Sequence, residues 1–180
     1  MVPFAKNSLT LAGDLGQRIY RRNFAWKDAG VEVIGHSHSL TGSFRTTKQI
    51  MEVAVYLARN EDVRGEDYVE PTIPDDQNGP KVRRLIRPDW YKAREGVAQE
   101  AARLWRERDD PGERIVVAAQ FDIIAGRLLT LLSDQGIPAS FIKQRELAAA
   151  EDCVVVTTLH QLKGLEFDHV LISGLEDETM

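Results

Sequence analysis

Cysteine is nearly absent from this sequence of 180 residues, which contains only Cys153. A single cysteine excludes an internal disulfide and cannot build a zinc site. Cys153 stands at the head of an apolar run, so we interpret it as a small buried hydrophobic residue. No apolar run approaches the roughly 20 residues that a membrane span needs, and the N-terminus lacks a signal-peptide pattern. These absences favour a cytoplasmic protein.

An excess of basic charge is also missing, because 28 Asp and Glu outnumber 23 Lys and Arg and give a net charge of −5. Such a balance argues against a stand-alone nucleic-acid binder, which normally carries a basic face. The 43% apolar and 28% charged residues are typical of a globular protein. A chain of this length can bury a core of its own.

The segment from residue 17 to residue 27 departs from the acidic average, because it contains no acid. Cations and aromatic rings are interleaved there: Arg18, Tyr20, Arg21, Arg22, Phe24, Trp26 and Lys27. This mixture suits a single strand of nucleic acid, whose bases stack while its backbone is held electrostatically. A solvated loop with a few packing aromatics is the alternative interpretation.

Groups for independent catalysis are missing as well. The sequence contains no G-x-x-x-x-G-K-[ST] phosphate loop and no convincing nucleophile–base pair, paired carboxylates or metal cluster. His36 and His38 alternate as they would on a strand, but no third ligand is apparent, so we interpret both as structural. No metal site is predicted.

Apolar periodicity predicts strands that alternate with helices. Helices are expected over 46–60, 89–108 and 121–134, with a short one around Glu146. Thr46 and Gln49 have the capping-box spacing, and Gly136 can end the third helix. The first two helices should carry apolar stripes, formed by Ile50, Val53, Ala54 and Leu57 and by Ala93, Val97, Ala101, Leu104 and Trp105.

Strands are expected at 8–12, 31–34, 82–86, 115–119, 138–142, 153–156 and 170–172. Residues 61–81 are rich in acid, Pro, Gly and Asn, which is typical of a loop. The alternation predicts an α/β fold with a mainly parallel sheet and helices on both faces.

Three segments resemble motifs of the UvrD/Rep-type superfamily 1 helicases, in the order that this family requires. Residues 9–21 are similar to motif III, which reads G-D-x-x-Q-x-I-Y at its core, and residues 40–50 are similar to motif IV. Residues 153–167, an apolar strand followed by T-T-L-H-Q-L-K-G-L-E-F, are similar to motif V. The resemblance implies a RecA-like second motor domain of the P-loop NTPase type that lacks the P-loop. It assigns residues 1–30 to a hinge segment from the first motor domain and 31–180 to the second, incomplete at its C-terminus.

The same resemblance implies roles for individual residues. Gln17 would bind the γ-phosphate and the attacking water, and Arg45 would reach the γ-phosphate with its planar fork, so both are candidate catalytic residues. Phe44 would stack on adenine, Glu166 would accept hydrogen bonds from ribose, and Gly164 would allow close backbone approach. Gln17, Arg45 and Glu166 are expected to converge on one concave wall. The alternative interpretation of Arg45 is an arginine that merely covers the end of a strand, and that of Phe44 is a phenylalanine of the core.

Nucleic-acid contacts are implied for Thr158, His160 and Lys163 in motif V, and for Tyr20 and Trp26 near motif III. Many relatives have Trp where this sequence has Arg22, so either Trp26 takes over base stacking or the grip on DNA differs. Lys163 also fits a plain surface cation.

The resemblance implies an ATP-dependent helicase or translocase, with ATP and Mg²⁺ as cofactors of the complete protein and DNA repair as a setting. Its partners would be single-stranded nucleic acid, DNA rather than RNA, the first motor domain of the same parent chain, and RNA polymerase. Because the phosphate loop, Walker B strand and motif VI are missing, we expect a piece of a motor that binds no nucleotide and turns over no ATP alone. The alternative function is a non-catalytic RecA-like module that contacts nucleic acid or RNA polymerase.

Many members carry a large subdomain between motifs IV and V, but only 112 residues (46–157) lie between Arg45 and Thr158 here. The expected strands and helices use most of them, so the insertion is absent or trimmed to 61–81. This departure leaves duplex unwinding in doubt and fits a reduced branch, such as polymerase-associated translocases.

Overall fold

The computed structural model describes residues 45–60, 70–73, 76–143 and 152–174, together with Gly30, His38 and Gly42. The chain divides into two compact units, Met1–Arg83 and Arg84–Met180. The strands expected at 8–12 and 31–34 and the short helix around Glu146 lie outside the described residues. The predicted boundary between residues 30 and 31 stays a prediction.

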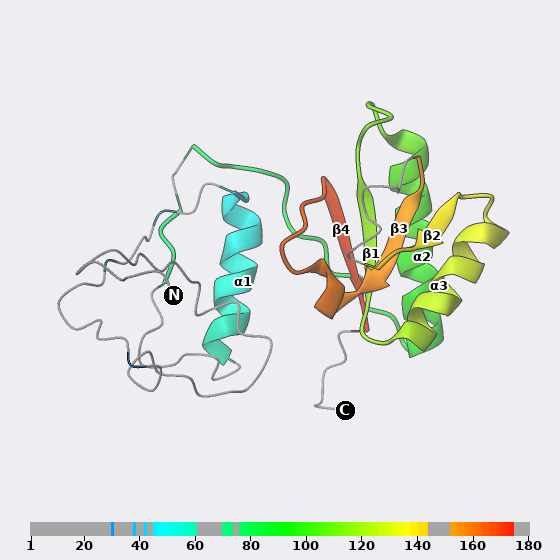
Figure 1. Cartoon of the computed structure of the whole chain (residues 1–180), viewed down its shortest axis with the longest axis horizontal. Helices are drawn as coiled ribbons and strands as arrows, with labels where there is room; N and C mark the ends of the chain where they lie inside the picture. The colour runs from blue at the N-terminus through cyan, green and yellow to red at the C-terminus, as the bar shows by residue number, and fades with distance from the viewer. Residues whose placement is uncertain are drawn as a thin grey trace, which may run out of the picture. The chain divides into compact units, whose positions relative to one another are not determined.

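The first unit contains helix α1, Lys48–Asn60, which confirms the helix expected over 46–60 (Figure 1). Its first turn is held by residues 77–79, since Lys48 N donates to Gln77 O at 2.8 Å. The expected apolar stripe is not buried: Ile50, Val53 and Leu57 are 50%, 40% and 49% exposed. Residues 70–73 and 76–81 form no helix or strand, as expected for a loop, and Thr72 makes an isolated bridge to Gly42.

The capping box expected from Thr46 and Gln49 is wrong. The Gln49 side chain binds a distant loop instead, because its Oε1 accepts from Gly79 N at 2.8 Å and its Nε2 donates to Asn78 Oδ1 at 3.3 Å. A Cβ at Gly79 would overlap the Thr47 side chain, so this close approach requires glycine.

The second unit is built on a four-stranded, all-parallel sheet. Its strands are β1 (Ile115–Ala119), β2 (Ala139–Phe141), β3 (Val154–Thr158) and β4 (His169–Ser173), in the order β2-β3-β1-β4. Strands β1 and β3 are buried along their whole length, as continuous apolar strands of parallel sheets are. The α/β class and the parallel sheet are confirmed.

Two helices of this unit confirm the expected pattern, α2 (Trp90–Glu107) and α3 (Asp122–Asp134). Asp89 caps α2, because Lys92 N donates to its Oδ1 at 2.8 Å. Gly136, at φ +70°, ends α3 in the left-handed conformation, and Ile137 N donates back to Leu132 O at 3.0 Å.

Both helices pack on the same face of the sheet (Figure 1). The main core joins the two helices to alternate residues of the strands: Ala98, Ala101, Leu128, Leu132, Ile115, Val117, Val154 and Val156. On the opposite face, Leu162 and Phe167 cover Val116, Val155 and Ile142. Among the described residues, this second face is therefore covered by a short turn and not by a long helix.

The strand expected at 82–86 is wrong. These residues form no strand, and Val82 and Ile86 are 46% and 72% exposed. Their apolar side chains imitate the pattern of a strand, yet no neighbouring strand of the described chain supplies the hydrogen bonds that a sheet needs. No helix among the described residues is long and apolar enough to cross a membrane.

Candidate nucleotide and nucleic-acid site

The candidate site lies at the carboxyl ends of the parallel strands, where ligands bind in open α/β sheets. Three strands place their last residues side by side there, since Thr158 of β3 pairs with Ala119 of β1, and Ala119 pairs with Ser173 of β4. The turn that follows β3, residues 159–162, is here called the motif V turn. The sheet register puts it beside the ends of β1 and β4.

The turn after β3 is a short 3₁₀ helix, η4, Leu159–Leu162. Its last residue, Leu162, packs against Val116, Val155 and Ile142 on the second face of the sheet. Leu165 N donates to Leu162 O at 3.0 Å. Thr158 is buried at 7% exposure, whereas His160 and Lys163 are exposed. Burial on one side thus holds the turn in place and presents His160 to solvent on the other.

Gly164 and Glu166 follow the turn. Gly164 has φ +81°, and a Cβ there would meet nothing within 4 Å. Its backbone conformation, and not close packing, is what favours glycine at this position. Glu166 is exposed, so its carboxylate is available to a ligand even though it has an interaction within the chain.

Two polar atoms near the carboxyl ends were not found from the sequence. Ser173 Oγ and Gln161 Oε1 are buried and have no hydrogen-bond partner in the described chain. Thr157 Oγ1, by contrast, donates to Ile142 O at 2.8 Å and is structural. Buried polar atoms normally find a partner, so Ser173 and Gln161 can hydrogen-bond to a ligand or to water. A serine that ends an apolar strand was the available signal.

In the first unit, Arg45 is exposed three residues before α1 begins. Thr47 Oγ1, close to the helix start, is buried without a hydrogen-bond partner in the described chain. Gln17, Tyr20, Trp26 and Phe44 lie outside the described residues. The expected convergence of Gln17, Arg45 and Glu166 stays a prediction.

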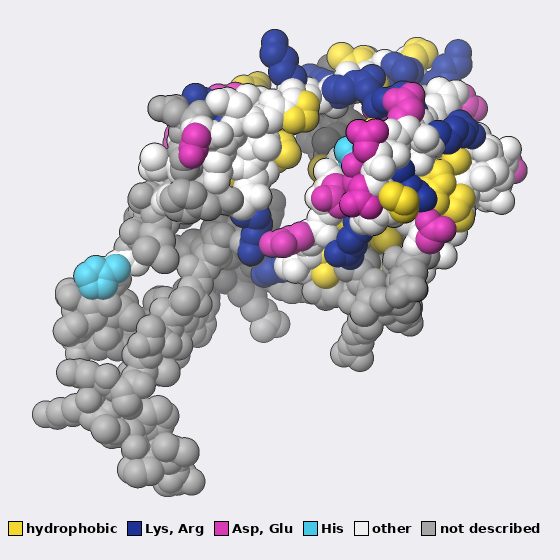
Figure 2. All heavy atoms as spheres, turned by 90° about the horizontal axis from the view of Figure 1, so that it is seen from above, with side chains coloured by type: hydrophobic (Ala, Val, Ile, Leu, Met, Phe, Trp, Pro, Cys, Tyr) yellow, Lys and Arg dark blue, Asp and Glu magenta, His cyan; other side chains and the backbone are white. Residues whose placement is uncertain are grey.

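The amino ends of the strands are chemically different. Arg108 pairs with Asp152 at 2.9 Å and lies 3.4 Å from the centroid of the Trp105 ring. His169 Nε2 lies 3.1 Å from Glu113 Oε2. Figure 2 looks onto this end of the sheet and shows basic and acidic side chains intermixed. A cavity of about 250 Å³ opens here, lined by Trp105, Pro111, Gly112, Glu113, Arg114, Asp152, Cys153 and Val155.

Within the described residues, no group of three His, Cys, Asp or Glu side chains could hold a metal ion. A family model described as the UvrD-like helicase C-terminal domain matches residues 128–180. No curated protein and no solved structure matches the chain. The matched range begins in α3 and includes β2, β3, the motif V turn and β4.

Proposed function

We propose, from the match of residues 128–180 to the UvrD-like helicase C-terminal domain, that the chain supplies the second motor domain of an ATP-driven helicase or translocase on single-stranded nucleic acid. The observation that carries this proposal is the place of the motif V turn. It lies within the matched residues and follows β3 at the carboxyl edge of the sheet.

The nucleic-acid side of the proposal rests on His160 and Lys163, with Thr158 behind them. The side chains of His160 and Lys163 are exposed beside a buried strand, so they can donate hydrogen bonds to phosphate oxygens. Contacts of this kind fix a strand in place without reading its sequence, as a translocase requires. We propose DNA as the track, in preference to RNA.

The nucleotide side rests on Arg45, Gly164 and Glu166, with Gln17 and Phe44 implied by the motifs. An exposed arginine can stabilise charge on a transferring phosphoryl group, and an exposed carboxylate can accept from ribose hydroxyls. ATP with Mg²⁺ would supply the phosphoryl group and the free energy of the cycle. The first motor domain of the parent chain would supply the phosphate loop that this sequence lacks.

The nucleic-acid side is tested by measuring how tightly the chain binds a labelled single-stranded oligonucleotide. Fluorescence anisotropy at low salt monitors this binding. We expect His160→Ala/Lys163→Ala to weaken binding roughly tenfold, since each removed contact is charge-assisted. The matched control is Arg106→Ala, which removes an exposed cation at the last turn of α2. Equal affinity for the double variant and the unsubstituted chain would contradict the proposed contacts.

The alternative function is a non-catalytic module that contacts nucleic acid or RNA polymerase. Kinetics of the parent protein separate the two. In a motor, Arg45→Ala should lower the kcat of ATP hydrolysis by about 10³-fold or more while nucleic-acid binding remains, because an arginine on the transferring phosphoryl group has that effect. A parent protein whose hydrolysis is insensitive to Arg45→Ala, or that has none, supports the module.

A further inference from the structure

Residues 81–94 carry an excess of positive charge that the motif resemblance does not explain. The segment holds one acid, Asp89, and six cations: Lys81, Arg83, Arg84, Arg87, Lys92 and Arg94. The whole chain, by contrast, has a net charge of −5. The Asp89 carboxylate is already engaged as the cap of α2, so it offsets the basic character of the surface only in part.

Two stacked aromatic rings lie within this segment. The centroids of Trp90 and Tyr91 are 3.4 Å apart, with 28° between the ring planes, and the two residues are 45% and 57% exposed. The Arg94 guanidinium lies 4.2 Å from the Trp90 centroid. A guanidinium beside exposed rings offers both a stacking face and a positive charge to one ligand.

These rings lie at the same end of the sheet as His160. Helix α3 begins directly after β1, and its C-terminus lies near that of α2, because Arg106 Nη2 donates to Gln135 O at 2.8 Å. The two helices therefore run side by side in the same direction, opposite to the strands. The first turn of α2, with Trp90 and Tyr91, thus falls at the carboxyl end of the sheet, on the face opposite to the one that η4 covers (Figure 1).

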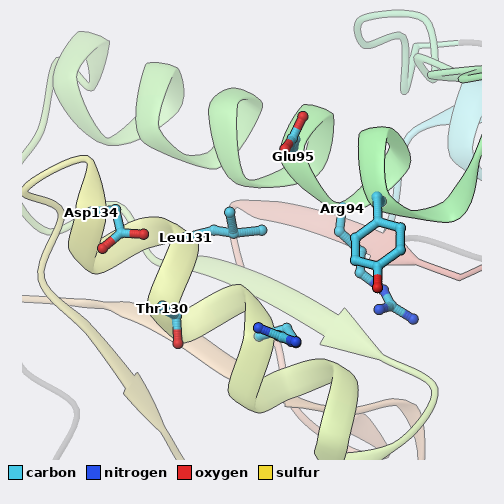
Figure 3. A pocket seen from close by; sticks show the side chains of 7 residues that line it. Arg94, Glu95, Thr130, Leu131 and Asp134 are labelled. Atoms are coloured by element: carbon cyan, nitrogen blue, oxygen red, sulfur yellow. The ribbon is translucent and has the colours of Figure 1, made fainter.

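A groove continues from this surface between α2 and α3. It has a volume of about 160 Å³ and is lined by Tyr91, Arg94, Glu95, Arg127, Thr130, Leu131 and Asp134. Figure 3 shows Arg94 and Asp134 at opposite ends of the groove. The end formed by Tyr91 and Arg94 suits an anionic ligand with planar groups, whereas Glu95 and Asp134 make the rest of the groove less favourable for one.

We propose that Arg87, Trp90, Tyr91, Lys92 and Arg94, here called the α2 platform, form a second binding surface for single-stranded nucleic acid. Bases stack on the exposed faces of Trp90 and Tyr91, and the cations neutralise the neighbouring phosphates. The inference rests on the proposed function, because the nucleic-acid strand that contacts His160 would be the one that continues onto the α2 platform. Stacking requires unpaired bases, so the ligand is a single strand and not a duplex.

The test is the affinity of the full 180-residue chain for labelled oligothymidine at several salt concentrations. We expect Trp90→Ala/Tyr91→Ala to weaken binding roughly tenfold, the loss typical of removing stacked bases. Trp90→Phe should keep most of the affinity, because the ring remains. Lys92→Ala should reduce the slope of log affinity against log salt by about one. Matched controls are Tyr56→Ala, a 66% exposed aromatic on α1, and Arg106→Ala at the other end of α2, neither of which should change binding.

The outcomes separate this inference from the proposed function. Unchanged binding by Trp90→Ala/Tyr91→Ala, together with weakened binding by His160→Ala/Lys163→Ala, overturns the platform and leaves the function standing. No binding by the unsubstituted chain, or no loss in either variant, overturns both. Equal losses on a blunt duplex, or competition by polyglutamate as effective as by oligothymidine, would show a site for charge alone and overturn the stacking role. Circular dichroism of each folded variant excludes a loss caused by unfolding.

Discussion

The two ends of the parallel sheet use similar residue types in different ways. At the amino end, Arg108 and His169 face carboxylates of the same chain at 2.9 and 3.1 Å, and an aromatic ring stacks beneath the arginine. At the carboxyl end, His160 is exposed, and the rings of Trp90 and Tyr91 face solvent. Side-chain contacts within the chain stabilise the fold, whereas exposed side chains at the carboxyl end offer binding to a partner.

The difference shows why residue type alone does not identify a site. A histidine occurs at each end, in the sequence Leu159-His160 and in Asp168-His169. Only the structure shows that His169 lies against Glu113 while His160 stands on a turn above a buried strand. Predictions for the two ends can therefore be opposite: stability should depend on the amino end, and binding on the carboxyl end.

The largest expected effect comes from Leu128→Ala. Leu128 is fully buried in the main core, which joins α2 and α3 to the sheet. We expect the free energy of unfolding to fall by about 2–5 kcal/mol. Trp90 reports on the carboxyl end and Trp105 on the amino end, so urea unfolding in a Trp26→Phe background, with each tryptophan retained singly, measures both. Coincident midpoints are expected for the two probes.

The matched control is Ile123→Ala on the same helix, whose side chain is 80% exposed. It should change the free energy of unfolding by less than about 0.5 kcal/mol. Separate transitions for the two tryptophans would mean that the ends unfold independently, and the comparison between ends of one cooperative unit would no longer hold.

At the amino end, Arg108→Ala should lower stability by about 1–2 kcal/mol without changing oligonucleotide affinity. The Arg108 side chain is 15% exposed, and the substitution removes both its ion pair with Asp152 and its contact with the Trp105 ring. Arg108→Lys keeps the charge but loses the planar stacking, and should cost about half as much. Chemical denaturation and anisotropy on the same preparations provide the two measurements. A loss of affinity in Arg108→Ala would place binding at both ends.

Gly136→Ala should lower stability by about 1 kcal/mol, because alanine is strained at φ +70°. A Cβ there would meet nothing within 4 Å, so crowding adds nothing to the effect. Gly126→Ala is the control, since Gly126 lies within α3, also has open space, and should gain helix propensity. Thermal unfolding should shift downward for the first variant and not for the second.

The smallest effect is expected from His169→Gln. The pair with Glu113 is about one-third exposed on each side, so its loss should cost less than about 1 kcal/mol. Glu113→Gln should cost about as much, and the double variant no more than either single one, because the two side chains act as a pair. Urea denaturation of the three variants measures this coupling, and additive losses would show that the pair is not coupled.

Most of the second unit could be predicted from its sequence. The valine-rich strands, the 3.6-residue spacing in α2 and the glycine after α3 each encode their local structure within a few residues. The strand expected at 82–86 failed because a strand depends on a partner elsewhere in the chain. The capping box failed for the same reason, since Gln49 binds Gly79 and Asn78, about 30 residues away.

For the candidate site, the sequence predicted where the turn after β3 lies, and the roles of its residues stay predictions. The motif V turn places Thr158 and His160 at the carboxyl end of β3, as the sequence implied. Ser173 Oγ and Gln161 Oε1 were missed because burial, and not residue type, makes them notable. The α2 platform was missed because its cations and aromatics fall at the start of a helix and match no motif, although the charge of residues 81–94 could have indicated it.

The order of the strands also affects how this chain emerges from the ribosome. Strand β1 pairs with β3 and β4, so Val116 must wait for Val155 and Val170, which are made 39 and 54 residues later. Until then, an aliphatic segment that is wholly buried in the native state remains exposed and prone to pair wrongly. Because such distant pairings form slowly, we expect collapse of the sheet to follow synthesis of β4, and the nascent chain to depend on chaperones that bind extended apolar segments.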